Sequence, residues 1–221
     1  MERRNHINAD PSFSCATDST TYLKVRTHAA SLFADRGYSN VGLRELAAHL
    51  GIKAGSIYNH IESKEVLLFE LVEELYEDLL DVVTRPVRKR LTHGDRLECL
   101  IVGHLQLYLE KSTYFRVAEH ASSCLTASHR QSIDGLVAQY ERALLLTLSS
   151  MGAGSSSTPA IIAVKSIAAL FHHLPHWVGD VDINSKAYRC LLKNMILGAL
   201  AVGKPPNAGA MHSISITEHA L

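Results

Sequence analysis

Apolar residues recur at helical spacing along most of this 221-residue chain. Leu67, Leu71 and Leu75 lie four positions apart and acidic residues occupy the opposite face, which predicts one long amphipathic helix over 64–84. Pro86 ends or kinks this helix, because proline has no backbone N–H to donate. Strand-like alternation is nearly absent after it begins, so the pattern predicts an all-α protein of about nine helices.

Two shorter apolar patterns precede the long helix. Leu43, Leu46 and Leu50 predict a short helix that Gly51 ends, since glycine readily takes the left-handed conformation that closes a helix. A second short helix is predicted from about Lys53 to His60. Two short helices joined by a tight turn containing glycine form a helix-turn-helix, whose second helix can lie in the major groove of DNA.

The segment over 22–70 resembles the DNA-binding domain of the TetR (tetracycline repressor) family of bacterial regulators. The matching residues are Ala29, Leu32, Phe33, Gly37, Tyr38, Leu43, Arg44, Glu45, Leu46, Ala47, Gly51, Ile52, Gly55, Ser56, Ile57, Tyr58, His60, Lys64 and Glu65. The resemblance implies a sequence-specific repressor that binds double-stranded DNA at a palindromic operator as a homodimer. It also implies release from DNA by a small organic effector.

Three positions depart from the family pattern at the helix starts. Val41 and Gly42 stand where a Thr or Ser often caps the second helix, and Lys53 stands where a Ser often caps the third. The cap of the second helix is therefore expected from Asn40 or Gly42, with Glu45 available for a reciprocal bond.

The resemblance also indicates which residues contact DNA. Sequence choice is expected from the exposed first turn of the second short helix, helped by Asn59 and Arg44, and phosphate contacts from Tyr58, His60 and Lys64. Some of these could instead be solvated polar residues, and Tyr58 and His60 could pack against the first helix. The predicted DNA contacts are Arg44, Lys53, Ala54, Gly55, Ser56, Tyr58, Asn59, His60 and Lys64.

Charge is distributed unevenly, although the formal net charge is zero. The segment 21–64 carries Lys24, Arg26, Arg36, Arg44, Lys53 and Lys64 against Asp35, Glu45 and Glu62, and the helix that follows is acidic. A basic end on a neutral-to-acidic body fits a protein that touches DNA with one end.

The chain divides into four predicted parts. These are a flexible N-terminal arm over 1–20, the helix-turn-helix domain over 21–64, a ligand-binding and dimerisation domain over 65–203, and a loose C-terminal tail over 204–221. The last two predicted helices are the most apolar, and a helix that is apolar nearly all round is expected to be buried. The family resemblance implies that a second copy buries them, in a four-helix dimer interface.

An effector site is expected inside the helical bundle, because small-molecule sites are mostly apolar with a few polar groups. Each candidate taken singly could equally be core or surface. Trp177 closes an apolar helix in a segment that resembles family members sensing fatty acyl or other CoA thioesters. The candidates are His104, Tyr108, Phe115, His120, Tyr140, His172 and Trp177.

Other functions find less support in the sequence. His172 and His176 have the spacing of a metal pair, but no nearby Asp, Glu or Cys completes a set. No metal and no cofactor are therefore predicted, and a metal-sensing variant is kept as an alternative. Cys99, Cys124 and Cys190 lie among apolar residues and are interpreted as small buried side chains, with a redox-sensing variant as the alternative. Enzyme motifs such as GxSxG, HExxH and a phosphate loop are absent.

Two expectations concern location and the competing type of protein. No apolar run reaches the length of a membrane span and the first residues lack the apolar core of a secretion signal, so we expect a cytoplasmic protein that does not enter a membrane. The competing hypothesis is a helical interaction module that retains the helix-turn-helix fold without specific DNA binding.

Overall fold

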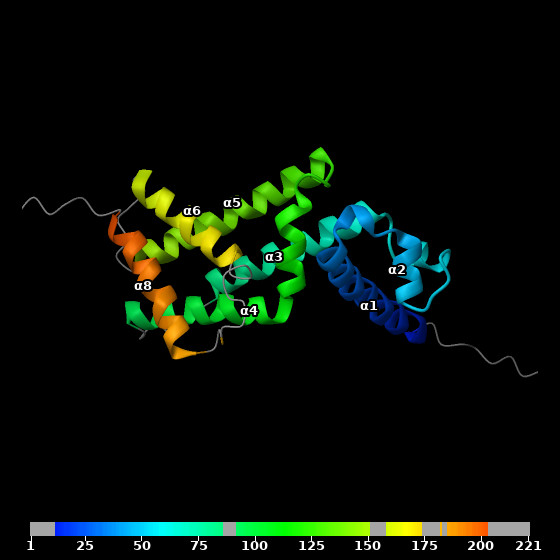
Figure 1. Cartoon of the computed structure of the whole chain (residues 1–221), viewed down its shortest axis with the longest axis horizontal. Coiled ribbons are helices and arrows are strands. Elements are labelled where there is room, and N and C mark those ends of the chain that lie inside the picture. The colour runs from blue at the N-terminus through cyan, green and yellow to red at the C-terminus, as the bar shows by residue number, and fades with distance from the viewer. Residues whose placement is uncertain (1–11, 86–91, 151–157, 174–181, 183–184, 203–221) are drawn as a thin grey trace, which may run out of the picture.

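The computed structural model describes residues 12–85, 92–150, 158–173, 182 and 185–202 (Figure 1). Those residues form seven α-helices and two short 3-10 helices and contain no strand, which confirms the all-α prediction for this part of the chain. In chain order the elements are α1 (Ser12–Arg36), η1 (Tyr38–Asn40), α2 (Leu43–His49), η2 (Ser56–Asn59), α3 (Lys64–Thr84), α4 (His93–Ala121), α5 (Ala127–Ser150), α6 (Thr158–His172) and α8 (Lys186–Val202).

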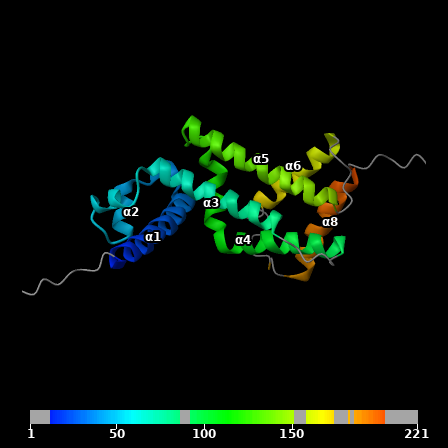
Figure 2. The same ribbon diagram turned by 180° about the vertical axis from the view of Figure 1, so that it is seen from behind.

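The helices are arranged as a small head joined to a larger body (Figures 1 and 2). Helices α1 and α2 lie at one end, and α3 leads from them into a bundle with α4, α5, α6 and α8. Within the bundle α3 packs against α4 and α5, and α6 packs against α5 and α8. Helix α3 therefore spans both parts.

The predicted start and end of α3 agree with the structure. Ser63 caps its first turn by accepting a hydrogen bond from the Val66 backbone N–H at 3.0 Å. At the start of α4, Thr92 and Asp95 form a reciprocal capping box, in which each side chain satisfies the other residue's backbone N–H.

The described residues differ from the sequence-based expectations at three places. Helix α4 is a single long helix with a local interruption at Lys111, which lowers the helix count by one. The third head helix is a short 3-10 turn, η2. Helix α1 begins at Ser12, so residues 12–20 are helical and not part of an arm, because no Gly or Pro lies between Ser12 and Arg36 to stop the helix.

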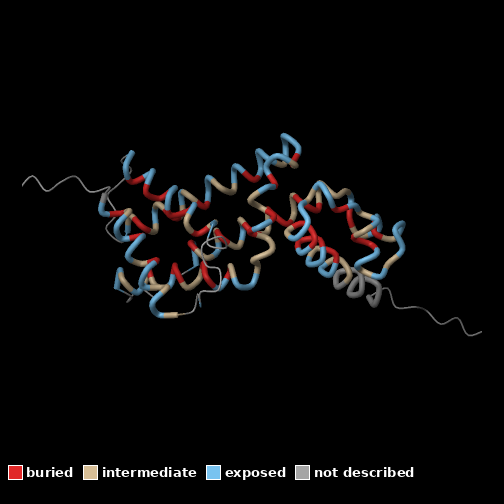
Figure 3. Tube along the Cα trace, viewed as in Figure 1, coloured by how far each residue is buried: buried red, intermediate tan, exposed pale blue. Residues whose placement is uncertain are grey.

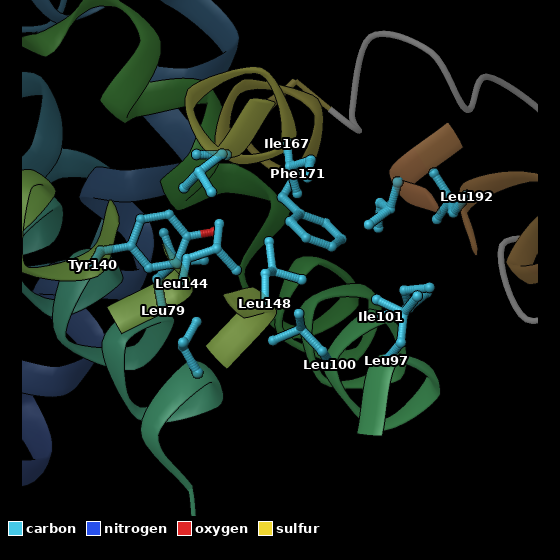
Figure 4. Close-up of a cluster of buried hydrophobic side chains, with 14 of the residues drawn as sticks. Leu79, Leu97, Leu100, Ile101, Tyr140, Leu144, Leu148, Ile167, Phe171 and Leu192 are labelled. Carbon is cyan, nitrogen blue, oxygen red and sulfur yellow. The ribbon is translucent and has the colours of Figure 1, made fainter. Parts of the chain in front are cut away.

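Buried apolar side chains form two clusters, and Figure 3 shows them along the inward sides of the helices. We call them the head cluster and the body cluster. The head cluster contains residues such as Val25, Phe33, Leu46 and Ile57. The body cluster joins α3, α4, α5, α6 and α8, and Figure 4 shows its centre: Leu79, Leu97, Leu100, Ile101, Tyr140, Leu144, Leu148, Ile167, Phe171 and Leu192.

Candidate nucleic-acid interface and body core

The turn after α2 depends on Gly51. Its φ of +68° is in the left-handed region, where a side chain other than glycine's is strained. The Gly51 N–H donates to Ala48 O at 3.1 Å and the Ile52 N–H to Ala47 O at 3.0 Å, which is the hydrogen-bond pattern of a Schellman motif. This motif ends α2 and directs the chain into the segment predicted to contact DNA.

We call that segment (residues 53–60) the reading turn. The prediction of an α-helix from Lys53 to His60 was wrong. Only Ser56–Asn59 are helical, as η2, and the Ser56 N–H donates to Lys53 O at 2.8 Å. The physical reason lies in the two departures from good helix-forming sequence. Lys53 has no side-chain oxygen to accept an orphan N–H at the helix start, and Gly55 costs about 1 kcal/mol in a helix relative to alanine.

The reading turn has a buried side and an outer side. Ile57 is fully buried in the head cluster and Ile61 is nearly so, which anchors the turn to α1 and α2. Tyr58 has 62% of its surface exposed, so it does not pack into the head. The remaining candidates are exposed at Lys53, Ala54, Gly55 and Asn59 and half-buried at Ser56 and His60.

The start of α2 has no side-chain cap. Gly42 is the N-cap residue and makes no side-chain bond, while Asn40 donates to Arg36 O at 2.8 Å. Glu45 forms an ion pair with Arg36 and not the expected reciprocal bond. Arg44 is exposed in the first turn of α2, on the same domain as the reading turn. Its side chain is thus accessible to a partner.

Lys64 makes contacts within the protein that the sequence did not indicate. Its ammonium group donates to Tyr38 O and lies 4.0 Å from the centre of the Tyr38 ring, and it is half-buried. Burial lowers the pKa of this ammonium group. Lys64 therefore joins the start of α3 to η1 within the protein, and its contact with a DNA phosphate stays a prediction.

The body core holds a histidine–tyrosine pair that the sequence suggested only as separate residues. His104 is 1% exposed; its Nδ1 lies 2.8 Å from Leu100 O and its Nε2 lies 2.9 Å from the Tyr140 hydroxyl. A carbonyl can only accept, so Nδ1 donates and the Tyr140 O–H donates to Nε2. Burial lowers the pKa of His104 to about 4, against a smaller opposing effect of its hydrogen bond to Leu100, so the ring is neutral at pH 7.

A second histidine–tyrosine pair lies beside the first. His172 Nε2 is 3.3 Å from the Tyr76 hydroxyl, and the two rings are stacked with centroids 5.4 Å apart. Burial lowers the pKa of His172 to about 4, with the neighbouring His173 acting in the same direction. Phe115 contacts both His172 and Tyr108, with ring centroids 5.8 Å and 5.6 Å away.

The structure thus brings five of the seven predicted effector residues together. These five are His104, Tyr108, Phe115, Tyr140 and His172. His120 is exposed in the last turn of α4 and does not join them, and Trp177 lies outside the described residues. Sequence reasoning missed Tyr76 and Phe171 as members of this group. The Phe171 ring stacks on the His104 ring, with centroids 3.9 Å apart. Tyr76 could have been noticed in the sequence as a tyrosine within a stripe of Leu and Val.

The outer faces of α6 and α8 carry apolar side chains on the surface of the single chain. The exposed fractions are 41% for Ile161, 60% for Ile162, 55% for Leu191, 38% for Met195 and 47% for Leu197. A hollow of about 420 Å³ lies between these two helices, lined by Ile167, Leu170, His173, Met195 and three small residues. An apolar surface of this kind on a domain of this size marks an interaction site.

Three other expectations concern metal ligands, the burial of cysteines and membrane-spanning helices. The described part of the chain contains no cluster of three or more His, Cys, Asp or Glu side chains able to hold a metal ion, and His176 lies outside it. Cys99 and Cys190 are exposed on α4 and α8, so the interpretation as buried side chains was wrong for these two. Cys124 follows α4 and is partly buried against the head cluster. None of the described helices is long and apolar enough to cross a membrane.

Comparison with known proteins gives a match confined to the head. Residues 26–71 match the model of the bacterial regulatory proteins of the tetR family. Over 68 residues the chain is 37% identical to the HTH-type transcriptional repressor KstR2 of Mycolicibacterium smegmatis, which covers 28% of this chain and 33% of that protein. The chain therefore aligns with about a third of the length of the curated relatives it matches.

Solved structures extend the likeness from the head to the whole fold. A tetR-family regulatory protein from Rhodococcus RHA1 has a TM-score of 0.68 at 20% identity, covering 83% of this chain and 96% of that chain. AibR, solved in complex with isovaleryl coenzyme A and operator DNA, has a TM-score of 0.62 at 21% identity, covering 80% and 96%. The head thus matches the model of the bacterial regulatory proteins of the tetR family over residues 26–71, and the chain shares the fold of solved tetR-family proteins.

Proposed function

We propose that the protein is a transcriptional repressor that binds a palindromic operator as a homodimer and leaves it when a small organic effector binds the body. The observation that carries the proposal is the reading turn, in which Ile57 is buried while Lys53, Tyr58 and Asn59 are exposed. Such a turn presents a short row of side chains and a close-lying backbone at Ala54 and Gly55 to the major groove.

Roles for the head residues follow from their exposure and chemistry. Lys53 can reach a phosphate or the acceptor edge of a guanine, and Asn59 can bond to an adenine edge. Tyr58 and His60 are proposed phosphate contacts, which position the head without choosing a sequence. Arg44 and Ser56 complete the proposed interface.

Dimerisation is proposed through the outer faces of α6 and α8. Their exposed isoleucine, leucine and methionine side chains and the hollow between them offer an apolar surface that a second copy of the same two helices would cover. A two-fold dimer places two reading turns on two half-sites about one helical turn of DNA apart, which explains how so small a head gains specificity.

The dimer is tested by a single charge placed in the proposed interface. Ile162→Asp is expected to convert a dimer into a monomer in analytical ultracentrifugation, because an unpaired carboxylate would be desolvated at the contact. Leu109→Asp is the matched control, since Leu109 is 50% exposed and belongs to α4, not to α6 or α8. Dissociation by both variants, or by neither, would contradict the proposed interface.

The effector is proposed to bind in the body near the two histidine–tyrosine pairs. Apart from His104, every buried residue of the described part is apolar or aromatic, so the interior suits the apolar portion of an organic molecule. AibR was solved with both isovaleryl coenzyme A and operator DNA, which supports an effector of the acyl-coenzyme A kind for a chain with the same fold. Such a ligand must prefer the state that does not fit the operator, since equal affinity for both states shifts nothing.

DNA binding is tested by measuring affinity for duplex DNA at several salt concentrations. If the dimer neutralises about eight phosphates, log K should fall against log salt with a slope of about −7. Fluorescence anisotropy with labelled duplexes gives this slope directly. A flat dependence, or no binding at low salt by a folded dimer, would instead favour a protein-interaction module.

A further inference from the structure

The boundary between the head and body clusters does not fall where α3 begins. The head cluster includes Leu71 and Val72 of α3, and the body cluster takes over from Leu75. Helix α4 is divided in the same way. Its residues up to Phe115 belong mainly to the body, whereas the head cluster contains Val117 and Ala121 of α4, Leu125 from the turn that follows and Ile133 of α5. The unit that packs with the head therefore includes the end of α4.

Four charged side chains meet at this boundary, and we call them the clasp: Arg26 of α1, Glu74 and Asp78 of α3, and Lys111 of α4. Glu74 binds Arg26 through one carboxylate oxygen and Lys111 through the other. Lys111 also forms an ion pair with Asp78. A single carboxylate on the connecting helix thus ties the first helix of the head to a helix of the body.

The side chains of the clasp are partly buried, so solvent and salt weaken their ion pairs less than those on the surface. The side chains of Arg26 and Lys111 are 17% and 21% exposed, and that of Glu74 is 32% exposed. Partly buried ion pairs are screened much less by salt than exposed ones. Burial lowers the pKa of Lys111, but its hydrogen bonds to Asp78 and Glu74 raise it by more, so the ammonium group stays charged. Arg26 is further fixed by donating to Glu70 O at 2.9 Å.

Lys111 is also the residue at which α4 is interrupted. Its φ of −127° and ψ of 31° are not helical, and no Pro or Gly lies between residues 104 and 121 to cause the break. Figures 1 and 2 show α4 changing direction on its way to the head. After the interruption, Arg116 bonds to Asp35 and to Ala34 O of α1, at 3.0 Å and 2.6 Å, so this last part of α4 is attached to the head.

We propose that the clasp is a positioning device for operator binding: Glu74 and Lys111 hold the head at a fixed orientation to the body and so set operator affinity without touching DNA. The clasp joins three helices at the point where both connecting helices pass from one hydrophobic cluster to the other. When it is broken, each head keeps its own fold, but the two heads of a dimer no longer hold the spacing of two half-sites. This inference rests on the proposed function.

The test compares Glu74→Gln with Glu77→Gln in the full-length protein. Both substitutions remove the same charge from α3, but Glu77 is exposed and outside the clasp. Affinity is measured for a palindromic duplex and for a duplex carrying one half-site, because a single bound head does not depend on the spacing of two heads. Lys111→Gln removes the cation of the same ion pair. Its control is Arg142→Gln, which removes a cation from an exposed position on α5.

We expect Glu74→Gln and Lys111→Gln to weaken binding to the palindrome by about 10-fold, within the usual range of coupling between sites. Binding to the half-site should be unchanged, and both controls should resemble the wild-type protein. The double variant should lose little more than either single one, since both break the same contact. If melting shows that Glu74→Gln does not fold, Asp78→Asn removes one Lys111 contact and leaves the Arg26–Glu74 pair intact.

Two results would overturn the clasp. One is unchanged palindrome affinity in both Glu74→Gln and Lys111→Gln. The other is an equal loss on both duplexes, which would indicate damage to the head itself. Failure of the proposed function is recognised separately, because then the folded wild-type dimer itself prefers no palindrome, and the clasp has no operator binding to position.

Discussion

The buried neutral state of His104 predicts that the protein loses stability in mildly acidic solution. An unfolded histidine has a pKa of about 6.5, whereas His104 in the folded protein has a pKa of about 4. The fold therefore favours the neutral ring. This stability is present above about pH 6.5 and is lost as the pH falls toward 4, because the unfolded chain binds the proton that the folded chain excludes.

The size of this effect follows from the two pKa values. A change from 6.5 to about 4 corresponds to about 3 kcal/mol in total, of which about 2 kcal/mol is lost between pH 7 and pH 5. The 1% exposure of His104 means that water screens little of it. Other groups add to the pH dependence of the wild-type protein, so the contribution of this ring requires a variant.

The assay is urea unfolding followed by circular dichroism at pH 7, 6 and 5. One protein concentration is used throughout, because the stability of the proposed dimer would depend on concentration. His104→Phe should reduce the loss of unfolding free energy between pH 7 and pH 5 by about 2 kcal/mol, whatever its stability at pH 7. His120→Phe, an exposed position on the same helix, should leave the loss as in the wild-type protein. An identical pH dependence of His104→Phe and the wild-type protein would refute the reasoning.

Three single substitutions test other parts of the structure. Gly51→Ala should lower the free energy of unfolding by about 1 kcal/mol, because alanine is strained at a φ of +68°; a gain in thermal stability would contradict the Schellman turn. A Cβ on Gly103 would lie 2.9 Å from Val82 Cγ1, so Gly103→Ala should destabilise the protein by about 1–3 kcal/mol. Adding Val82→Ala to the same chain should restore the lost stability. If it does not, α3 and α4 are not in close contact there. Lys53→Gln should change which duplexes are preferred in a binding competition while leaving the melting temperature unaltered, and an equal loss on all sequences would instead make Lys53 a phosphate contact.

Features set by local sequence were predictable. The four-residue spacing of Leu67, Leu71 and Leu75 identified α3, and all three are fully buried. The Thr92–Asp95 capping box depends only on two residues three positions apart. Periodicity and capping are properties of short segments, so one sequence is enough to find them.

Features set by tertiary contact were not predictable in the same way. His104 and Tyr140 are 36 positions apart, and the packing of both α4 and α5 against α3 brings them to 2.9 Å. Lys64 has the sequence position of a phosphate contact, yet its ammonium group donates a hydrogen bond to the Tyr38 carbonyl, 26 positions earlier in the chain. The weak helix start at Lys53 was visible in the sequence as a missing cap, but the pattern of buried Ile57 and Ile61 is satisfied by a 3-10 turn as well as by an α-helix.

Operator binding by a dimer is tested by selecting bound sequences from a random duplex DNA pool with the purified full-length protein. We predict enrichment of one palindrome with half-sites about one helical turn apart, and loss of that enrichment when Ile162→Asp separates the dimer. Contradiction would come from a wild-type protein that is folded and dimeric and enriches no sequence, with or without extract of the cells that make it.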